Sequence, residues 1–302
     1  MDHYNGDYVT DGENFVMEAA VLTYFKRNKI GLAPHLVAIL EEFTPPNATP
    51  SSQESSSCCG YVCIVSELYG EDLLYYVERR LKEERSLLPN EKRLLQRKAM
   101  EIVTFLHERG LCHLDVTPEN ILIGPQGMKL CDFGKTTPIY SSCIRHLKEA
   151  TGTNTKIPFE SCEPTIGKAA YMPPECWKVY RLLEDLRIHN PLEDLRHMTS
   201  LEKRKAFYFR VEDADVFMLG ILMFWIWSGG CIWKYSDPQT DFQFQTLVNF
   251  DMNVDAFHEC RKWPIPLKDI LKKSLSYQSS SRENLQHLIA HRWWKYPVQQ
   301  AL

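Results

Sequence analysis

The apolar and polar positions are most informative between residues 111 and 135. Residues 121–123 (Ile-Leu-Ile) and 128–131 (Met-Lys-Leu-Cys) are short apolar runs separated by Gly-Pro-Gln-Gly. Two strand-like runs around a turn-forming sequence predict a β-hairpin. We expect Ile123 to lie opposite Met128, so the residues that flank the two runs should meet at the open end of the hairpin.

Three side chains with oxygen atoms should therefore converge on one small volume. Asn120 and Asp132 flank the hairpin, and Asp115 lies one short loop upstream. An amide oxygen and a carboxylate suit Mg²⁺, and a second carboxylate nearby can accept a proton from a hydroxyl group. This combination favours phosphoryl transfer, which depends mostly on positioning and charge neutralisation.

Periodicity predicts the elements around this hairpin. A helical pattern starts at Asn14 and should end near Gly31, and another covers residues 89–109. Strands are expected at residues 36–40 and 61–65, with a mobile Pro/Ser-rich loop at 44–60 between them. The apolar run 216–227 is too short to span a bilayer and is expected to be a buried core helix.

Composition sets wide bounds. The chain has 302 residues, 44% of them hydrophobic and 25% charged, which is ordinary globular usage. A net charge of −4 gives no reason to expect a nucleic-acid partner. The ten cysteines are scattered without zinc-site spacing, and no signal peptide or transmembrane helix is seen, so a cytoplasmic location is expected.

Two motifs carry a resemblance to a known family. Residues 113–120 (HLDVTPEN) resemble the catalytic loop of eukaryotic protein kinases, and residues 132–134 (DFG) resemble the magnesium-binding triplet that follows it. Small-molecule kinases share the spacing from Asp115 to Asn120, so the loop alone does not fix the substrate. Pro118 and Glu119 lean towards Ser/Thr specificity.

The resemblance implies an α+β, two-lobed kinase-like fold over residues 14–296. Residues 14–69 would form an incomplete β-rich small lobe with the hinge, and residues 70–296 a mainly helical large lobe. The charged segment 177–209 looks like an insertion, expected to be an exposed helical hairpin.

The resemblance also implies an ATP site. The backbone of Glu67 and Tyr69 would bind the adenine edge, Ser66 would stand at the back of the pocket, and Leu122 would form its floor. Glu18 would be the helix glutamate that pairs with a small-lobe lysine.

Further family features appear later in the chain. Residues 167–175 (GKAAYMPPE) resemble the peptide-binding loop, and Glu175 is expected to pair with Arg282. Asp215 is expected to hold the backbone of the catalytic loop. Leu22, Ile39, His113 and Phe133 would form an apolar column between the lobes.

Some family features are missing or altered. No lysine or Gly-rich loop precedes Glu18, as in a late-starting or degenerate kinase. Leu114 replaces an arginine that grips a phosphorylated activation loop, so phosphorylation there should not be required. Thr117 stands in place of the catalytic-loop lysine, and Lys168 in place of a threonine that contacts it. Lys168 could restore the ammonium near the γ-phosphate, or it could be a solvent-facing lysine.

The resulting expectation is an ATP- and Mg²⁺-dependent protein Ser/Thr kinase. Asp115, with Lys168 and Thr117, would be catalytic, and Asn120 and Asp132 would hold the metal. The alternative is a pseudokinase that acts as a binding or scaffold module.

Overall fold

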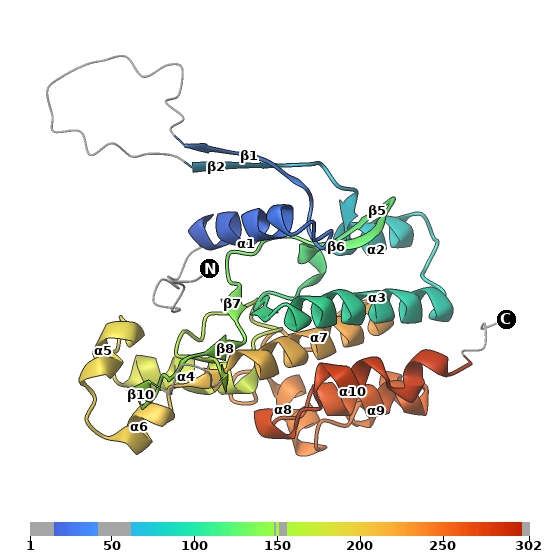
Figure 1. Cartoon of the computed structure of the whole chain (residues 1–302). Coiled ribbons are helices and arrows are strands. Elements are labelled where there is room, and N and C mark those ends of the chain that lie inside the picture. Colours follow the sequence, from blue (N-terminus) through green and yellow to red (C-terminus); the bar gives the residue numbers. More distant parts are fainter. Residues whose placement is uncertain (1–14, 42–61, 148, 151–155, 298–302) are drawn as a thin grey trace, which may run out of the picture.

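The computed structural model describes residues 15–41, 62–147, 149–150 and 156–297 (Figure 1). A smaller unit that contains α1, β1 and β2 lies above a larger, mainly helical unit, so the expected α+β, two-lobed architecture is confirmed. The predicted loop at 44–60 lies outside the described residues. No helix in the described part of the chain is both long and apolar enough to cross a membrane.

The small lobe consists of one helix and a two-stranded sheet. Helix α1 (Phe15–Arg27) has an acidic residue in its first turn and basic residues in its last, as the helix dipole favours. Strands β1 (Leu36–Glu41) and β2 (Val62–Ser66) pair antiparallel, with Ala38 opposite Val65. Both strands confirm the predictions from periodicity.

The hairpin that carries the site has the expected register. Strands β5 (Ile121–Gly124) and β6 (Gly127–Leu130) pair with Ile123 opposite Met128. The backbone N–H of Cys131 donates to the carbonyl of Asn120 at 3.1 Å, so the predicted alignment continues beyond the strands. Strand β3 (Glu71–Asp72), which follows the hinge, adds to the other edge of β5.

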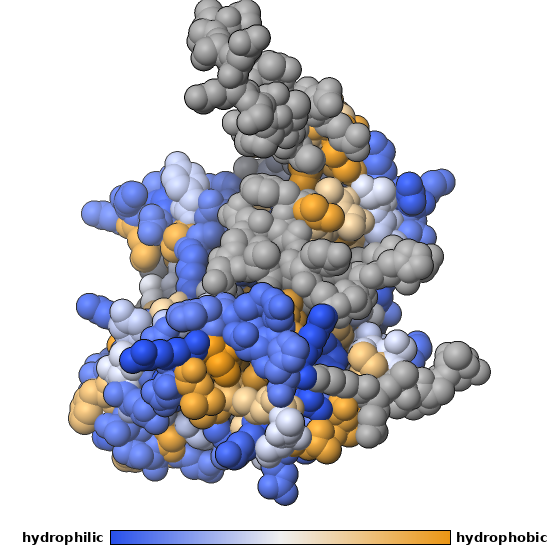
Figure 2. Space-filling model, turned by 90° about the vertical axis from the view of Figure 1, so that its left-hand side faces the viewer, coloured by the Kyte–Doolittle hydropathy of each residue, from blue (hydrophilic) through white to orange (hydrophobic). Residues whose placement is uncertain are grey.

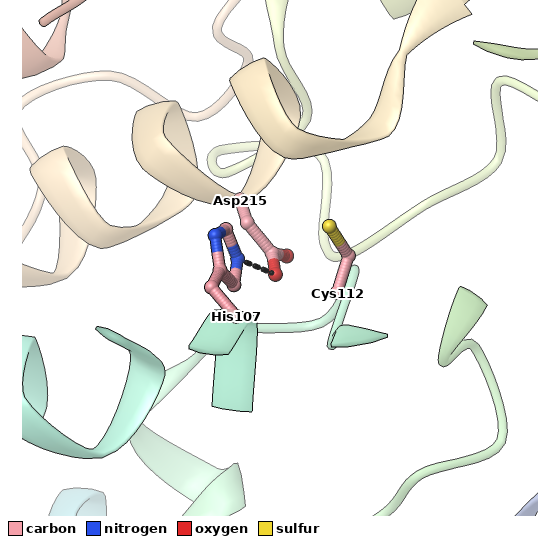
Figure 3. Close-up of side chains that lie close together, drawn as sticks. All are labelled: His107, Cys112 and Asp215. Atoms are coloured by element: carbon pink, nitrogen blue, oxygen red, sulfur yellow. Dashed lines mark hydrogen bonds and ion pairs between the residues drawn. The ribbon is translucent and has the colours of Figure 1, made fainter. Parts of the chain in front are cut away.

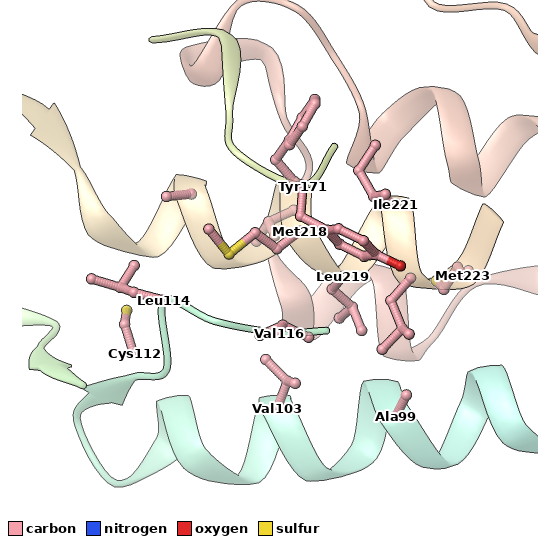
Figure 4. Close-up of a cluster of buried hydrophobic side chains, with 14 of the residues drawn as sticks. Ala99, Val103, Cys112, Leu114, Val116, Tyr171, Met218, Leu219, Ile221 and Met223 are labelled. Carbon is pink, nitrogen blue, oxygen red and sulfur yellow. The ribbon is translucent and has the colours of Figure 1, made fainter. Parts of the chain in front are cut away.

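Helices α3 (Pro89–Glu108) and α7 (Val211–Ser228) form the centre of the large lobe. The first residue of α3 is a proline. Glu91 lies in the first turn, and its carboxylate accepts the backbone N–H of Leu88 at 2.7 Å. Helix α7 is buried over most of its length and is capped by Gly229, whose φ of 85° suits a left-handed cap. Figure 4 shows its side chains packed between α3 and the segment around Tyr171. The other large-lobe helices of at least five residues are α2 (Leu73–Lys82), α4 (Pro174–Asp185), α5 (Pro191–His197), α6 (Leu201–Lys205), α8 (Phe242–Asn249), α9 (Ile265–Ser274) and α10 (Leu285–Ile289).

The segment after the DFG triplet is held by short antiparallel strand pairs. These are β4 (Leu111–Cys112) with β7 (Thr137–Pro138), β8 (Tyr140–Ser141) with β11 (Ile157–Pro158), β9 (Cys143–Ile144) with β10 (Glu149–Ala150), and β12 (Glu160–Ser161) with β13 (Phe209–Arg210). The last pair joins the end of this segment to the start of α7.

Residues 177–209 start inside α4 and contain α5 and α6. That they form an insertion in the large lobe stays a prediction. The segment is not fully exposed, since Leu195, Arg204 and Phe207 are buried. Figure 2 faces this end of the molecule and shows a largely hydrophilic surface with separate hydrophobic patches on the larger lobe. The charges cover the outside of a segment whose apolar residues pack inwards.

Candidate functional site

The backbone of the catalytic loop is hydrogen-bonded to one buried carboxylate. Asp215 is fully buried near the start of α7 and accepts the backbone N–H groups of His113 and Leu114, both at 2.7 Å. His107 adds a third contact, from its Nε2 to Asp215 Oδ2 at 2.9 Å (Figure 3). Leu114 has a φ of 62°, a strained conformation for a branched residue. The expectation that Asp215 holds this backbone is confirmed.

The cluster of His107, Cys112 and Asp215 has the residue types of a metal site but does not fit one. Their ligand atoms lie within 4.8 Å of one another. Both oxygens of Asp215 already accept backbone N–H groups. Burial raises the pKa of the Cys112 thiol well above its ordinary value, so the thiolate that a metal requires is disfavoured. The cluster positions the backbone.

Asp115 and Asn120 meet as predicted. Asn120 Nδ2 donates to Asp115 Oδ2 at 2.7 Å and to the Asp115 carbonyl at 3.0 Å. The other carboxylate oxygen, Asp115 Oδ1, is buried and has no hydrogen-bond partner among the described residues. Burial raises the pKa of Asp115, and the negative charge of the nearby Asp132 raises it further, while the interaction with His113 lowers it. An unpaired acceptor with a raised pKa suits a general base.

The DFG triplet is fixed by its contacts with the catalytic loop. Asp132 has a φ of 58°, and its Oδ1 accepts the backbone N–H of Gly134 at 3.3 Å. His113 Nε2 lies 3.0 Å from the carbonyl oxygen of Cys131. Phe133 is fully buried, and its ring centroid lies 5.2 Å from that of His113.

The apolar column differs from the expected one in part. The ring of Phe25 meets that of Phe133 edge-on at 5.3 Å between centroids. Leu22 is buried one turn earlier on α1, and Ile39 is only partly buried on β1. Phe25 therefore provides an aromatic contact between the lobes that the sequence did not single out.

The hinge is fastened to the hairpin by a buried cation. Lys129 lies in β6 opposite Leu122, and its ammonium pairs with Glu67 Oε1 at 2.6 Å. The same ammonium lies 4.0 Å from the ring centroid of Tyr69, whose hydroxyl donates to the carbonyl of Gly127 at 3.1 Å. The pKa of Glu67 is lowered by its hydrogen bond with Lys129. Lys129 thus ties the hinge to the strands that flank Asn120 and Asp132.

The structure also places the other residues of the predicted ATP site. Leu122 is half-buried on β5, and Ser66 is exposed at the end of β2. The Glu67 backbone N–H is used by the carbonyl of His35 at 2.9 Å. Glu18 is half-buried on α1, and its charge, after burial and Asp132, contributes to raising the pKa of Cys131 to about 12. Glu18 therefore lies on the side of α1 that faces the DFG segment.

Lys168 reaches the catalytic loop but pairs with Glu119. Its ammonium forms an ion pair with Glu119 Oε1, and 54% of its side chain is exposed. Its charge also acts to lower the pKa of Asp115, so it lies near the predicted base. Thr117 is fully buried, and its hydroxyl oxygen has no partner among the described residues. No direct contact joins Lys168 to Thr117 in the hydrogen bonds of this structure.

The predicted peptide-binding loop, residues 167–175, is held by the expected pair between Glu175 and Arg282. Arg282 donates from Nη1 and Nη2 to the two carboxylate oxygens of Glu175 at 2.5 and 2.6 Å. Only 1% of the Arg282 side chain is exposed, and it also donates to the carbonyl of Asp213 at 2.9 Å. Removing one partner of such a buried pair leaves an uncompensated charge.

Comparison with known proteins agrees with this geometry. The family described as protein kinase domain matches residues 13–180, more than half of the chain. The chain belongs to the protein kinase family. It is 26% identical over 168 residues to the probable serine/threonine-protein kinase KKQ8 of Candida glabrata, covering 55% of this chain and 20% of that protein.

Two other kinases match shorter stretches. The serine/threonine-protein kinase HAL5 of Saccharomyces cerevisiae is 32% identical over 94 residues, which are 30% of this chain and 11% of that protein. The 3-phosphoinositide-dependent protein kinase 1 of Arabidopsis thaliana is 33% identical over 90 residues, which are 30% of this chain and 17% of that protein. The chain spans a fifth or less of the length of these kinases.

Sequence reasoning missed Lys129, His107 and Phe25. Lys129 is a charged residue next to Leu130 on a strand, and nothing in the sequence indicates that its ammonium group is buried. Its partner Glu67 is 62 residues away. His107 lies at the end of a recognised helix, and its partner Asp215 is 108 residues away. Phe25 was visible on the apolar face of α1, and that face was the available signal for this contact.

Proposed function

We propose that this chain transfers the γ-phosphoryl group of ATP to a Ser or Thr hydroxyl of a protein substrate. The observation that carries the proposal is the buried, unpaired Asp115 Oδ1 beside Asn120. Asp115 accepts the hydroxyl proton while the substrate oxygen bonds to the γ-phosphorus. The bond from that phosphorus to the β,γ-bridging oxygen breaks, and ADP leaves with the electron pair.

The described residues fit Mg²⁺. Asn120 Nδ2 faces Asp115, which leaves the amide oxygen for a cation, and the Asp132 carboxylate is on the adjoining segment. Hard oxygen ligands of this kind bind Mg²⁺, which neutralises charge on the phosphates when bound. Leu122 and the backbone of Glu67 and Tyr69 would hold the adenine, as the resemblance implies.

Lys168 is proposed to supply a positive charge at the transferred phosphate. It already lies within electrostatic reach of Asp115 and is held by Glu119 of the catalytic loop. Thr117 is proposed to support the loop from inside, since it is fully buried. The eight cysteines of the described segments are free, which fits a cytoplasmic location.

The test measures phosphate transfer from labelled ATP to a generic protein substrate. Asp115→Asn should reduce the rate by at least about a hundredfold, because the general base is lost. Lys168→Met should reduce the rate by about tenfold to a thousandfold. Lys178→Met, an exposed lysine on α4, is the charge-matched control and should keep full activity. If Asp115→Asn keeps the wild-type rate, the proposed mechanism is refuted.

The alternative function is a nucleotide-binding or scaffold module without transfer. Two observations favour it. Lys168 pairs with Glu119, and the residue in place of the catalytic-loop lysine, Thr117, is buried and uncharged. A thermal shift with ATP and Mg²⁺ tests whether nucleotide binds, since a ligand stabilises the state that it binds, and the transfer assay then separates the two functions. A shift that disappears in Asp132→Asn, together with no transfer by the wild type, would establish the alternative.

A further inference from the structure

Residues 186–210 bind the activation segment, which runs from the DFG triplet to Glu175, through a buried arginine. Arg204 on α6 is only 4% exposed. Its Nε donates to the carbonyl of His146 in the activation segment, and its Nη1 donates to the carbonyl of Met198 at 3.3 Å. An arginine so deeply buried is costly unless its donors are used, and here backbone carbonyls use them.

The activation segment closes around this arginine. His146 is buried, and its Nδ1 lies 2.5 Å from Glu160 Oε2. Arg145 Nη1 donates to the carbonyl of Glu160 at 3.1 Å. Glu160 itself is in β12, which pairs with β13 at the end of the same 186–210 segment. Side-chain and backbone bonds therefore join the two segments at neighbouring points.

The joined strands lead directly to the substrate side of the site. Ser161 Oγ accepts the backbone N–H of Glu163, and the chain then reaches Gly167 with a φ of 63°. A β-carbon on Gly167 would lie 3.7 Å from Asp115 Oδ1. A displacement of β12 would therefore be transmitted over a few residues to the backbone beside the predicted base.

We propose that Arg204 is a positioning residue that holds the activation segment ready for protein substrate. Kinases with an arginine before the catalytic aspartate can use a phosphate to fix this segment, and Leu114 offers no such partner. Arg204 comes from within residues 186–210 and binds backbone carbonyls rather than a phosphate. The proposal rests on the proposed function for its catalytic consequence, but the order of the segment is testable without activity.

The first experiment measures amide hydrogen exchange in the intact chain. Arg204→Met should speed exchange in residues 157–161 by about tenfold or more, because a charged donor is lost to buried carbonyls. Exchange in α3 should stay unchanged. Lys203→Met removes the same charge from an exposed neighbour and should leave both regions unchanged. Equal exchange in residues 157–161 for Arg204→Met and Lys203→Met would overturn the proposal.

Conservative variants show whether the effect of Arg204→Met is more than simple misfolding. Arg204→Lys keeps the charge and should recover part of the protection in residues 157–161. Glu160→Gln weakens the contact with His146, and its effect should be less than additive with that of Arg204→Lys because the two sites share His146. Strict additivity would show that they do not act as one unit.

The kinetic experiment uses phosphatase-treated protein. Arg204→Met should raise KM for a protein substrate by about tenfold and leave KM for ATP within about twofold, since the ATP residues lie elsewhere. Equal changes in both constants would mean a general structural role and would refute the positioning role. If the wild type transfers no phosphate, the proposed function fails, while the exchange experiment still decides whether Arg204 orders the segment.

Discussion

Replacing Asp215 should separate the catalytic loop from its support. Asp215→Ala removes the acceptors of two buried backbone N–H groups, those of His113 and Leu114, each bonded at 2.7 Å. A hydrogen bond to a charged group contributes about 1.5–3 kcal/mol, so the loss should be about 3–6 kcal/mol. A domain of ordinary stability has about 5–15 kcal/mol in total, so the variant should be marginal.

Asp215→Asn should show a smaller loss for a geometric reason. The amide keeps one acceptor oxygen but points an N–H₂ group at a backbone N–H donor, so one bond is lost and one buried donor is left unpaired. We expect a loss of about 2–4 kcal/mol. The rate of phosphate transfer should fall further than the loss of folded protein accounts for. The reason is that Leu114 precedes Asp115 and would relax from its φ of 62°.

Urea unfolding followed by tryptophan fluorescence measures the change, since the chain has seven tryptophans. Asp251→Asn is the control: 88% of the Asp251 side chain is exposed and its pair with Lys272 lies on the surface, so the loss should stay below about 0.5–1 kcal/mol. A loss below about 1 kcal/mol for Asp215→Ala would show that other contacts hold the loop.

Three further predictions test other parts of the structure. Burial raises the pKa of Asp213 to about 6 from 3.8, so its protonated form stabilises the fold below about pH 4 and this contribution is lost as the pH rises through 6. Asp213→Asn should remove this pH dependence from the denaturation midpoints and raise the free energy of unfolding near pH 7 by up to about 3 kcal/mol. An unchanged pH dependence would contradict the raised pKa of Asp213. Gly70→Ala should destabilise far more than Gly110→Ala in urea titrations, because a β-carbon on Gly70 would lie 1.9 Å from the Ile123 carbonyl whereas the space around Gly110 is open. Phosphatase treatment should leave the rate of phosphate transfer unchanged, and its abolition would refute the inference from Leu114.

Local sequence signals predicted much of the site. The hairpin register followed from two apolar runs and the turn between them, and it brought Asn120 and Asp132 to the same end. The support from Asp215 and the Glu175–Arg282 pair followed from the family resemblance. In each case a short motif fixed the residue types, and the fold then had few ways to arrange them.

The contacts that sequence could not predict are between distant residues with no motif. Arg204 lies in a run of charged residues, and charged runs are usually solvated. Its burial depends on the backbone of His146, 58 residues earlier, and a carbonyl group leaves no trace in the sequence. The same holds for Lys129 and Glu67, whose charges are ordinary until the hinge and hairpin are placed together.

The start of α7 connects these two kinds of support. Strand β13 ends at Arg210, α7 begins at Val211, and Asp215 lies one turn further along. The activation segment is thus bound to the residues directly before the helix, while the catalytic loop is bound to its first turns. Because α7 is buried over most of its length, it provides one rigid support for the predicted base and for the predicted peptide-binding loop. The two loops are therefore held in a fixed relation to each other through one helix.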